Sequence, residues 1–178
     1  MYQAIISFWF SEVDRKSWWS ADPGFDELVR ARFSETLNRA SRAELYAWRE
    51  ARLGRLAEVL VLDQFARNIH RNTPRAFAQD PLALALAQEA ISVGAAAALK
   101  PIERNFLYMP FMHSESRLIH ECAEVLFLQN GLEDNYKFEL RHKAIIDRFG
   151  RYPHRNAILG RACTDEEAEF LKQPGSKF

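Results

Sequence analysis

The stretch LGRLAEVLVLDQFARNI, residues 53–69, is the most hydrophobic helical segment of the chain. At 100° per residue, its large apolar side chains cover nearly the whole circumference of a helix. A helix that is apolar on all sides belongs in the interior of a protein. We therefore expect residues 53–69 to form the most buried helix of the fold.

Helices are also expected on the N-terminal side of this segment. Residues 2–11 carry apolar side chains at helical spacing. Asp22 followed by Pro23 is typical of a helix start, with the aspartate as N-cap and the proline at the first helical position. Ser41 with Glu44 fits a capping box that opens a short helix.

The C-terminal side continues the helical pattern. Proline or capping residues mark the expected helix starts, which are Pro74, Asp80 with Pro81, Pro101, Ser114, and Thr164 with Glu167. The last two open helices over 115–129 and 165–172, and another helix over 135–149 ends at Gly150. Strand signals are almost absent, and no repeat of fixed period is visible. These patterns predict an all-α fold of about nine or ten helices in a single domain, residues 1–178.

The composition argues against several classes of protein. The chain has 178 residues, 48% of them hydrophobic, and its 24 basic and 24 acidic residues give a net charge of zero. This balance argues against a nucleic-acid partner. No apolar run reaches the roughly 18 residues of a membrane helix, and the N-terminus does not resemble a secretory signal. Cys122 and Cys163 share no short motif, which favours a cytoplasmic location and no metal or other cofactor.

Polar side chains interrupt the apolar surface of residues 53–69. Asp63 and Arg67 lie four residues apart on the face that carries Leu60. An ion pair at this spacing would share an apolar face, and buried charges are costly unless they are paired and hydrogen-bonded. The pair is either an internal structural bridge or part of a pocket, which Asn68 and Arg71 would extend as ligand-binding residues.

Three residues in the next helices are candidate catalytic groups, namely His113, Glu115 and His142. In the first turn of a helix an acid is favoured by the helix dipole, which explains Glu115 without a function. Alternatively, Glu115 is a general base or orients an arginine, while His113 moves protons. His142 shares a helical face with Phe138 and is either a core histidine or a further catalyst. The His-x-Glu pair without other ligands does not indicate a metal site.

The loop that follows the expected helix 135–149 is rich in cationic side chains. Its candidate anion ligands are Arg148, Arg151, Arg155 and Asn156, because arginine forks bind carboxylate and phosphate at two points. His154 lies between two arginines, so we expect its pKa to be lowered, which suits a catalytic base. In the alternative interpretation, these arginines tie the C-terminal tail to the helices through Glu103, Glu115 and Asp63.

Long stretches of the chain resemble one known family. They are LDQFARNIHRNTPRAFAQDPLALALA (62–87), PIERNFLYMPFMHSES (101–116), RFGRYPHRNAILGR with TDEEAEFL (148–171), and the FWF…WW…D…FD pattern from Phe8 to Asp26. Taken in their order along the chain, these stretches resemble a mainly bacterial family, domain of unknown function number nine hundred and twenty-four. The resemblance implies an all-helical fold similar to the tetratricopeptide-repeat superfamily, whose repeat consensus is not visible here. It implies no activity and no catalytic residue.

Two main hypotheses follow from these residues. In the first, the protein is an enzyme or a small-ligand binder, and an arginine-rich pocket holds a small anionic compound such as a phosphorylated one. In the second, which the tetratricopeptide-like resemblance favours, it is a helical module that binds a peptide or a protein. An RNA-associated role rests on the arginines alone. The first hypothesis requires Asp63, Arg67, His113, Glu115 and the 151–156 loop to line one open cavity.

Overall fold

The computed structural model describes residues 1–176, in which α-helices are joined by short turns and no β-strand occurs. The helices are α1 (Tyr2–Ser7), α2 (Pro23–Ser41), α3 (Arg52–Leu60), α4 (Ala66–Ile69), α5 (Asp80–Ser92), α6 (Pro101–Met112), α7 (Arg117–Asn130), α8 (Glu133–Phe149) and α9 (Asp165–Phe170). The all-α prediction is confirmed, and the number of helices is close to the expected one. Residues 177 and 178, the last two of the predicted domain, lie outside the described residues.

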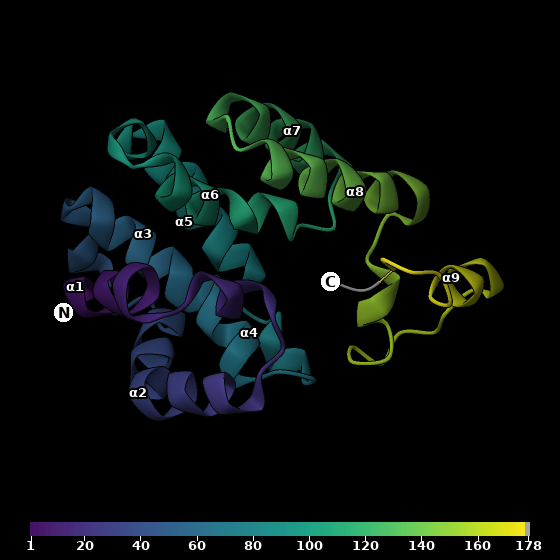
Figure 1. Ribbon diagram of the computed structural model, residues 1–178, viewed down its shortest axis with the longest axis horizontal. Coiled ribbons are helices and arrows are strands. Elements are labelled where there is room, and N and C mark those ends of the chain that lie inside the picture. The colour runs from purple at the N-terminus through teal and green to yellow at the C-terminus, as the bar shows by residue number, and fades with distance from the viewer. Residues whose placement is uncertain (177–178) are drawn as a thin grey trace.

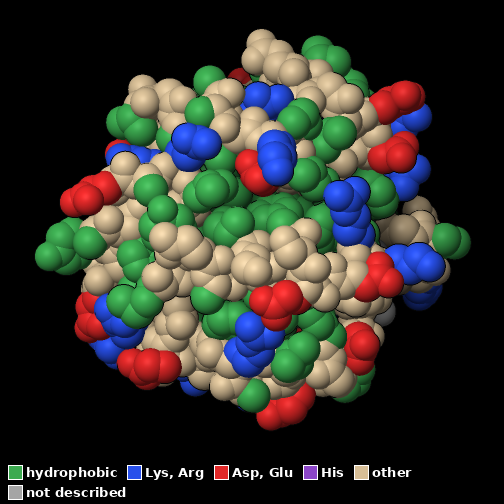
Figure 2. Space-filling model, turned by 60° about the vertical axis from the view of Figure 1, so that its left-hand side comes forward, with side chains coloured by type: hydrophobic (Ala, Val, Ile, Leu, Met, Phe, Trp, Pro, Cys, Tyr) green, Lys and Arg blue, Asp and Glu red, His purple; other side chains and the backbone are tan. Residues whose placement is uncertain are grey.

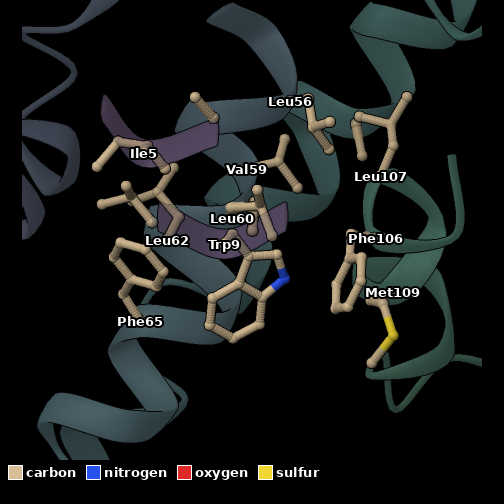
Figure 3. Close-up of a cluster of buried hydrophobic side chains, with 14 of the residues drawn as sticks. Ile5, Trp9, Leu56, Val59, Leu60, Leu62, Phe65, Phe106, Leu107 and Met109 are labelled. Atoms are coloured by element: carbon tan, nitrogen blue, oxygen red, sulfur yellow. The ribbon is translucent and has the colours of Figure 1, made fainter. Parts of the chain in front are cut away.

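The segment 53–69 is helical throughout, but it is not a uniform α-helix. A π-helical turn, Val61–Phe65, separates α3 from α4. Every residue from Leu56 to Ala66 is buried, which confirms that this is the most buried segment. Aromatic rings from distant parts of the chain close around it. The Trp9 ring centroid lies 5.5 Å from that of Phe65 and 5.6 Å from that of Phe106 (Figure 3).

The hydrophobic side chains form one large cluster and one small one. The large cluster runs from Ile5 in α1 to Phe127 in α7. The small cluster consists of Ile145 and Ile146 of α8 with Tyr152, flanked by Phe149 and Phe170. In Figure 1, α9 and the chain that leads to it project from the end of α8, away from α1 and α3. The hydrophobic side chains of Tyr152 and Phe170 therefore pack against α8 rather than inside the main core.

Several predicted helix starts are confirmed. Asp22 caps α2 by accepting from the backbone N–H groups of Gly24 and Phe25. Thr164 and Glu167 form the predicted capping box of α9, in which each side chain accepts from the other residue's backbone N–H. In both motifs the partners lie within three positions of each other, so they can be predicted from the sequence.

Two predicted starts are wrong. Ser41 ends α2 rather than capping a new helix, because its hydroxyl donates to the carbonyl of Asn38, and only a 3-10 turn, Tyr46–Glu50, follows. The cap of α7 is Ser116 rather than Ser114. Glu115 consequently lies before the helix, so its position is not explained by the helix dipole.

The surface combines charged and apolar regions. Hydrophobic side chains gather in a hollow in the middle of the face shown in Figure 2, with most charged side chains around it. Within residues 1–176, no helix is both long enough and apolar enough to cross a membrane.

Candidate functional site

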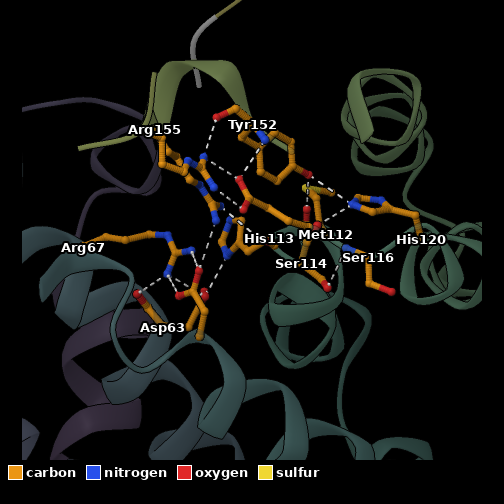
Figure 4. Close-up of polar contacts among 12 residues, drawn as sticks. Asp63, Arg67, Met112, His113, Ser114, Ser116, His120, Tyr152 and Arg155 are labelled. Atoms are coloured by element: carbon orange, nitrogen blue, oxygen red, sulfur yellow. Dashed lines mark hydrogen bonds and ion pairs between the residues drawn. The ribbon is translucent and has the colours of Figure 1, made fainter. Parts of the chain in front are cut away.

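Four segments that are far apart in the sequence meet beside the π-helical turn (Figure 4). Asp63 belongs to that turn, and Arg67 follows it in α4. Asp80 is the first residue of α5, His113 is the C-cap of α6, and Arg155 ends the 3-10 turn Pro153–Arg155. We call these five residues the central cluster. A π turn inserts an extra residue into a helix and often occurs at functional sites, and here it carries Asp63.

The contacts within the central cluster are short and mutually supporting. Oδ1 of Asp63 accepts from Nη1 of Arg67 at 2.8 Å and lies 2.7 Å from Nδ1 of His113. The Arg67 guanidinium also donates to both carboxylate oxygens of Asp80, each at 2.9 Å. The predicted i,i+4 pair of Asp63 and Arg67 is therefore present, and it is one edge of a larger network.

The environment fixes the protonation of Asp63 and His113. Burial opposes ionisation of Asp63, but the charge of Arg67 and the contact with His113 hold the pKa of its carboxyl well below its usual range. Burial and the charge of Arg67 lower the pKa of His113, against the opposing effect of Asp63. A neutral His113 beside an ionised Asp63 donates from Nδ1, so the lone pair is on Nε2. Among residues 1–176, the contact of the His113 ring with Asp63 runs through Nδ1 and not through Nε2.

Arg155 is the least satisfied cation of the cluster. Its guanidinium lies between the rings of Phe77 and Tyr152, at 4.7 and 4.6 Å from their centroids. Nη2 donates to the carbonyl of His113 at 3.0 Å, whereas Nη1 is 3.4 Å from Asp80. The side chain is only 7% exposed, and Nε has no partner within the described residues. Burial and the nearby Arg67 lower the pKa of Arg155.

A second polar network adjoins the cluster through Tyr152. The Tyr152 hydroxyl donates to the carbonyl of Met112 at 2.5 Å and lies 3.2 Å from Nε2 of His120. His120 donates from this nitrogen to the carbonyl of Ser114, while its Nδ1 lies 2.7 Å from Oε1 of Glu139. Burial raises the pKa of Glu139, and its Oε2 has no partner among the described residues. The buried carboxyl group of Glu139 therefore contacts His120 through one oxygen only.

Two predicted catalytic histidines lie against the Tyr152 ring. The ring centroids of His142 and His154 are 5.7 and 5.6 Å from that of Tyr152. Burial lowers the pKa of His142 to about 3, although the hydrogen bond to the carbonyl of Phe138 favours the charged form. Burial and Arg155 lower the pKa of His154 to about 4, in the direction predicted from its flanking arginines. Both side chains are therefore neutral near pH 7.

Glu115 connects the C-terminal loop to the body of the protein. Both of its carboxylate oxygens accept from the Arg161 guanidinium, at 2.6 and 3.0 Å, and Oε1 also accepts from the backbone N–H of Tyr152. This arrangement corresponds to the interpretation in which arginines tie the tail to Glu115. The arginine involved is Arg161 rather than Arg151 or Arg155.

Other predicted ligand-binding residues lie outside the central cluster. Asn68 and Arg71 both bind Asp26. Asn156 accepts from Nε of Arg161.

Arg148 and Arg151 pair with Glu166 and Glu167 at the α8–α9 junction. There they line a surface depression with a volume of about 290 Å³. The pairing of Arg151 also holds the pKa of Glu167 at about 2.

The central cluster converges as the first hypothesis requires, but its charges close on one another. Two surface depressions lie beside Arg148 and Arg151 and, with a smaller volume, beside His70 and Arg75. Neither contains a residue of the central cluster. The residues of the central cluster therefore face one another and not these two depressions.

Sequence reasoning did not identify Asp80, His120, Glu139 or Arg161 as members of the site. For His120 a signal existed, because it aligns with Ala123, Phe127 and Asn130 on the buried face of α7. Asp80 served only as an expected helix start, and its contact with Arg67 spans 13 positions. Glu139 and Arg161 find their partners across 19 and 46 positions, which no local pattern encodes.

Comparisons with known proteins agree with the fold. A solved structure, that of the protein of unknown function ATU0120 from Agrobacterium tumefaciens, is similar to this chain with a TM-score of 0.91 and 37% sequence identity over 96% of each chain. None of the curated proteins compared with the chain matches it. The sequence model described as "Bacterial protein of unknown function (DUF924)" matches residues 5–175. Because this match spans nearly the entire chain, the protein belongs to the bacterial DUF924 family, as the sequence motifs indicated.

Proposed function

We propose that the protein binds a small anionic molecule at the central cluster and transfers a proton through His113. The observation that carries this proposal is the 2.7 Å contact between Asp63 Oδ1 and His113 Nδ1, next to the incompletely hydrogen-bonded Arg155. A carboxylate that orients a neutral imidazole, beside a fixed cation, is the arrangement that general base catalysis on an anionic substrate requires.

Stability alone is a weak explanation for this cluster. Two arginines, two aspartates and a histidine are brought together at the edge of a large hydrophobic core. Replacing a buried ion pair by apolar side chains of similar volume is often neutral or stabilises a protein by about 1–4 kcal/mol. Strongly perturbed pKa values in one group of side chains are typical of functional sites. A chemical role therefore accounts for the cluster better than a purely structural one.

Each residue has a distinct part in the proposed chemistry. Asp63 holds the His113 tautomer with its proton on Nδ1 and stabilises the imidazolium that forms when Nε2 accepts a proton. Arg155 supplies positive charge for the anionic group of the substrate, and its Nε is a donor without a partner among the described residues. Arg67 is already engaged by Asp63 and Asp80, so it positions these carboxylates rather than the ligand.

Ligand binding can be tested with two conservative variants and a matched control. Inorganic phosphate, citrate and glucose 6-phosphate would be titrated against the wild type, Arg155→Lys and Arg71→Lys, with thermal stability as the readout. Lysine retains the charge but lacks the two-point donor geometry, so we expect at least about tenfold weaker binding in Arg155→Lys. Arg71 pairs with Asp26 outside the cluster, so Arg71→Lys should bind as the wild type does. Absence of stabilisation by any anion would argue strongly against the proposal.

The role of His113 has its own test. His113→Asn keeps an N–H donor facing Asp63 but removes the proton acceptor. In the wild type, ¹⁵N NMR should show an unprotonated Nε2 and a protonated Nδ1 at pH 7. The opposite tautomer would contradict the proposed proton acceptor. If an anion binds, its affinity for the wild type should depend on pH below 6.5, the ordinary histidine pKa. Its affinity for His113→Asn should not show this dependence.

A second candidate function, a helical module that binds a peptide or protein, is favoured by exposed apolar side chains on α7. Leu118, Val125 and Leu128 are 67%, 51% and 58% exposed. Large exposed apolar side chains on one helix are typical of interaction surfaces when they form a contiguous patch. The tetratricopeptide-like arrangement implied by the sequence resemblance would suit this role. A doubly substituted Leu118→Lys, Leu128→Lys protein that loses a partner but keeps anion binding would support this function rather than the first.

A further inference from the structure

We infer that the loop formed by residues 153–163 is a lid over the central cluster, latched by the ion pair between Arg161 and Glu115. The inference rests on the proposed function, since it states how a guest molecule would reach that site. It also accounts for the way the charges of the cluster close on one another.

The loop covers the cluster directly. Arg155 lies across His113, donating to its carbonyl at 3.0 Å, and its guanidinium is 3.4 Å from Asp80 (Figure 4). Beneath it, the side chains of Asp63 and His113 are 1% and 12% exposed. A molecule that is to reach both Asp63 and His113 from the side of Arg155 therefore requires the loop to move.

The loop is attached to the body by polar contacts and by the Arg155 guanidinium, which lies between the rings of Phe77 and Tyr152. No side chain of residues 153–163 belongs to either hydrophobic cluster. Its polar ties to the body include the Arg155 contacts and the bidentate pair of Arg161 with Glu115. The remaining bonds of Arg161 are internal to this end of the chain, to Oδ1 of Asn156 and the carbonyl of Tyr152. Polar contacts that water can replace are easier to open than a packed core.

The two ends of the loop are held together independently of the latch. Before the loop, Arg151 makes a bidentate pair with Glu167 of α9, at 2.6 and 2.7 Å. The rings of Phe149 and Phe170 pack at 5.0 Å between centroids. A loop of about this length with clamped, adjacent ends is an Ω-loop, which can swing as a unit while its anchors stay in place. Gly160, next to Arg161 of the latch, has a φ of +66°, a backbone conformation that other residues rarely adopt.

The latch can be broken without touching the central cluster. Arg161→Gln removes it, and Arg49→Gln is a control for the loss of a bidentate pair outside the loop, with a carboxylate, Glu58, that is more buried than Glu115. The Arg49 and Arg161 side chains are 27% and 24% exposed, respectively. Arg161→Lys, which keeps the charge, serves as a milder variant in case Arg161→Gln unfolds.

Two measurements on the full chain report lid opening without any ligand. Hydrogen–deuterium exchange of amides 153–163 should become about tenfold faster in Arg161→Gln, as expected for the loss of about 1.4 kcal/mol of charged hydrogen bonding, and less so in Arg161→Lys. Carbethoxylation of His113 by diethyl pyrocarbonate, followed by peptide mass spectrometry, should accelerate in parallel. Arg49→Gln should leave both rates unchanged.

The outcomes separate the lid from the proposed function. The lid is wrong if both Arg161 variants show the same rates as Arg49→Gln. It is also wrong if exchange becomes faster throughout the core. Neither outcome decides whether the cluster binds an anion, which the titration tests separately. Selective acceleration at 153–163 and His113 supports the lid even if none of the tested anions binds.

Discussion

His142 illustrates how the fold changes the chemistry of a single residue. The sequence placed it on an apolar helical face and left a core role and a catalytic role open. In the structure it lies against Tyr152, and its hydrogen bond to the Phe138 carbonyl keeps it within its own helix. Burial lowers its pKa from 6.5 to about 3, so it is neutral near pH 7.

This pKa shift predicts a loss of stability in acid. Between the unfolded pKa of 6.5 and the folded pKa of about 3, the unfolded chain binds a proton that the folded chain does not. Stability is therefore present above pH 6.5 and falls as the pH decreases through this window, by roughly 2 kcal/mol at pH 5 for this residue.

The measurement is urea unfolding of the wild type and His142→Asn from pH 7 to pH 4. Asparagine retains a donor for the Phe138 carbonyl but does not titrate, so its stability should depend less on pH. Equal pH dependence in the two proteins would show that His142 is not the responsible group. His154, whose pKa is about 4, adds to the wild-type slope in the same direction and is common to both proteins.

At the scale of elements, the α3–α4 segment depends on a close approach to the turn before it. A Cβ atom added at Gly54 would overlap the backbone carbonyl of Trp48. The 3-10 turn Tyr46–Glu50 can therefore pack against α3 only because residue 54 has no side chain. The helical pattern of residues 53–69 did not reveal this requirement, because a glycine within a helix reads simply as a weaker helix former.

Gly54→Ala should therefore be strongly destabilising. We expect a loss of roughly 3 kcal/mol from steric overlap with a backbone that cannot easily shift. Gly94→Ala is a suitable control, because its added Cβ meets no atom within 4 Å and only the φ of +77° is unfavourable. That control should cost about 1 kcal/mol. Chemical unfolding of both variants tests this, and a smaller effect at Gly54 than at Gly94 would contradict the packing argument.

The π-helical turn at Val61–Phe65 is a second feature of this element that changes the site. It places Asp63 beside His113, which is 50 positions away in the sequence. The sequence indicated the Asp63–Arg67 pair because i,i+4 spacing is a local property of helices. It did not indicate the extra residue in the helical turn, because such turns are set by what packs against them.

At the scale of the whole molecule, the C-terminal part is an addition to a core that ends earlier. Phe127 is the last buried member of the main cluster, and among residues 151–176 only Tyr152 and Phe170 belong to the small cluster on α8. The candidate site lies at the boundary between these two parts. We therefore expect the residues before Gly150 to provide most of the stability and the residues after it to complete the candidate site.

Truncation after Gly150 tests that separation. We expect residues 1–150 to remain helical and to unfold cooperatively, with stability reduced by roughly 3 kcal/mol because Tyr152 no longer covers Ile145 and Ile146. Circular dichroism with thermal and urea unfolding would measure this. Loss of helical content in the truncated protein would show that the C-terminal part is required for the core.

The sequence alone determined the helices, the most buried segment and the family, because helical periodicity, caps and long motifs are properties of neighbouring residues. It also identified Asp63, Arg67, His113 and Arg155 as polar residues of interest. Only the tertiary structure decided which of them meet, since the partners of His113 and Arg155 lie 50 and 75 positions away. It likewise assigned Arg148 and Arg151 to the α8–α9 junction and Asn68 and Arg71 to Asp26. Pairing between charges depends on the distances that the packed core imposes, and those distances are absent from any local pattern.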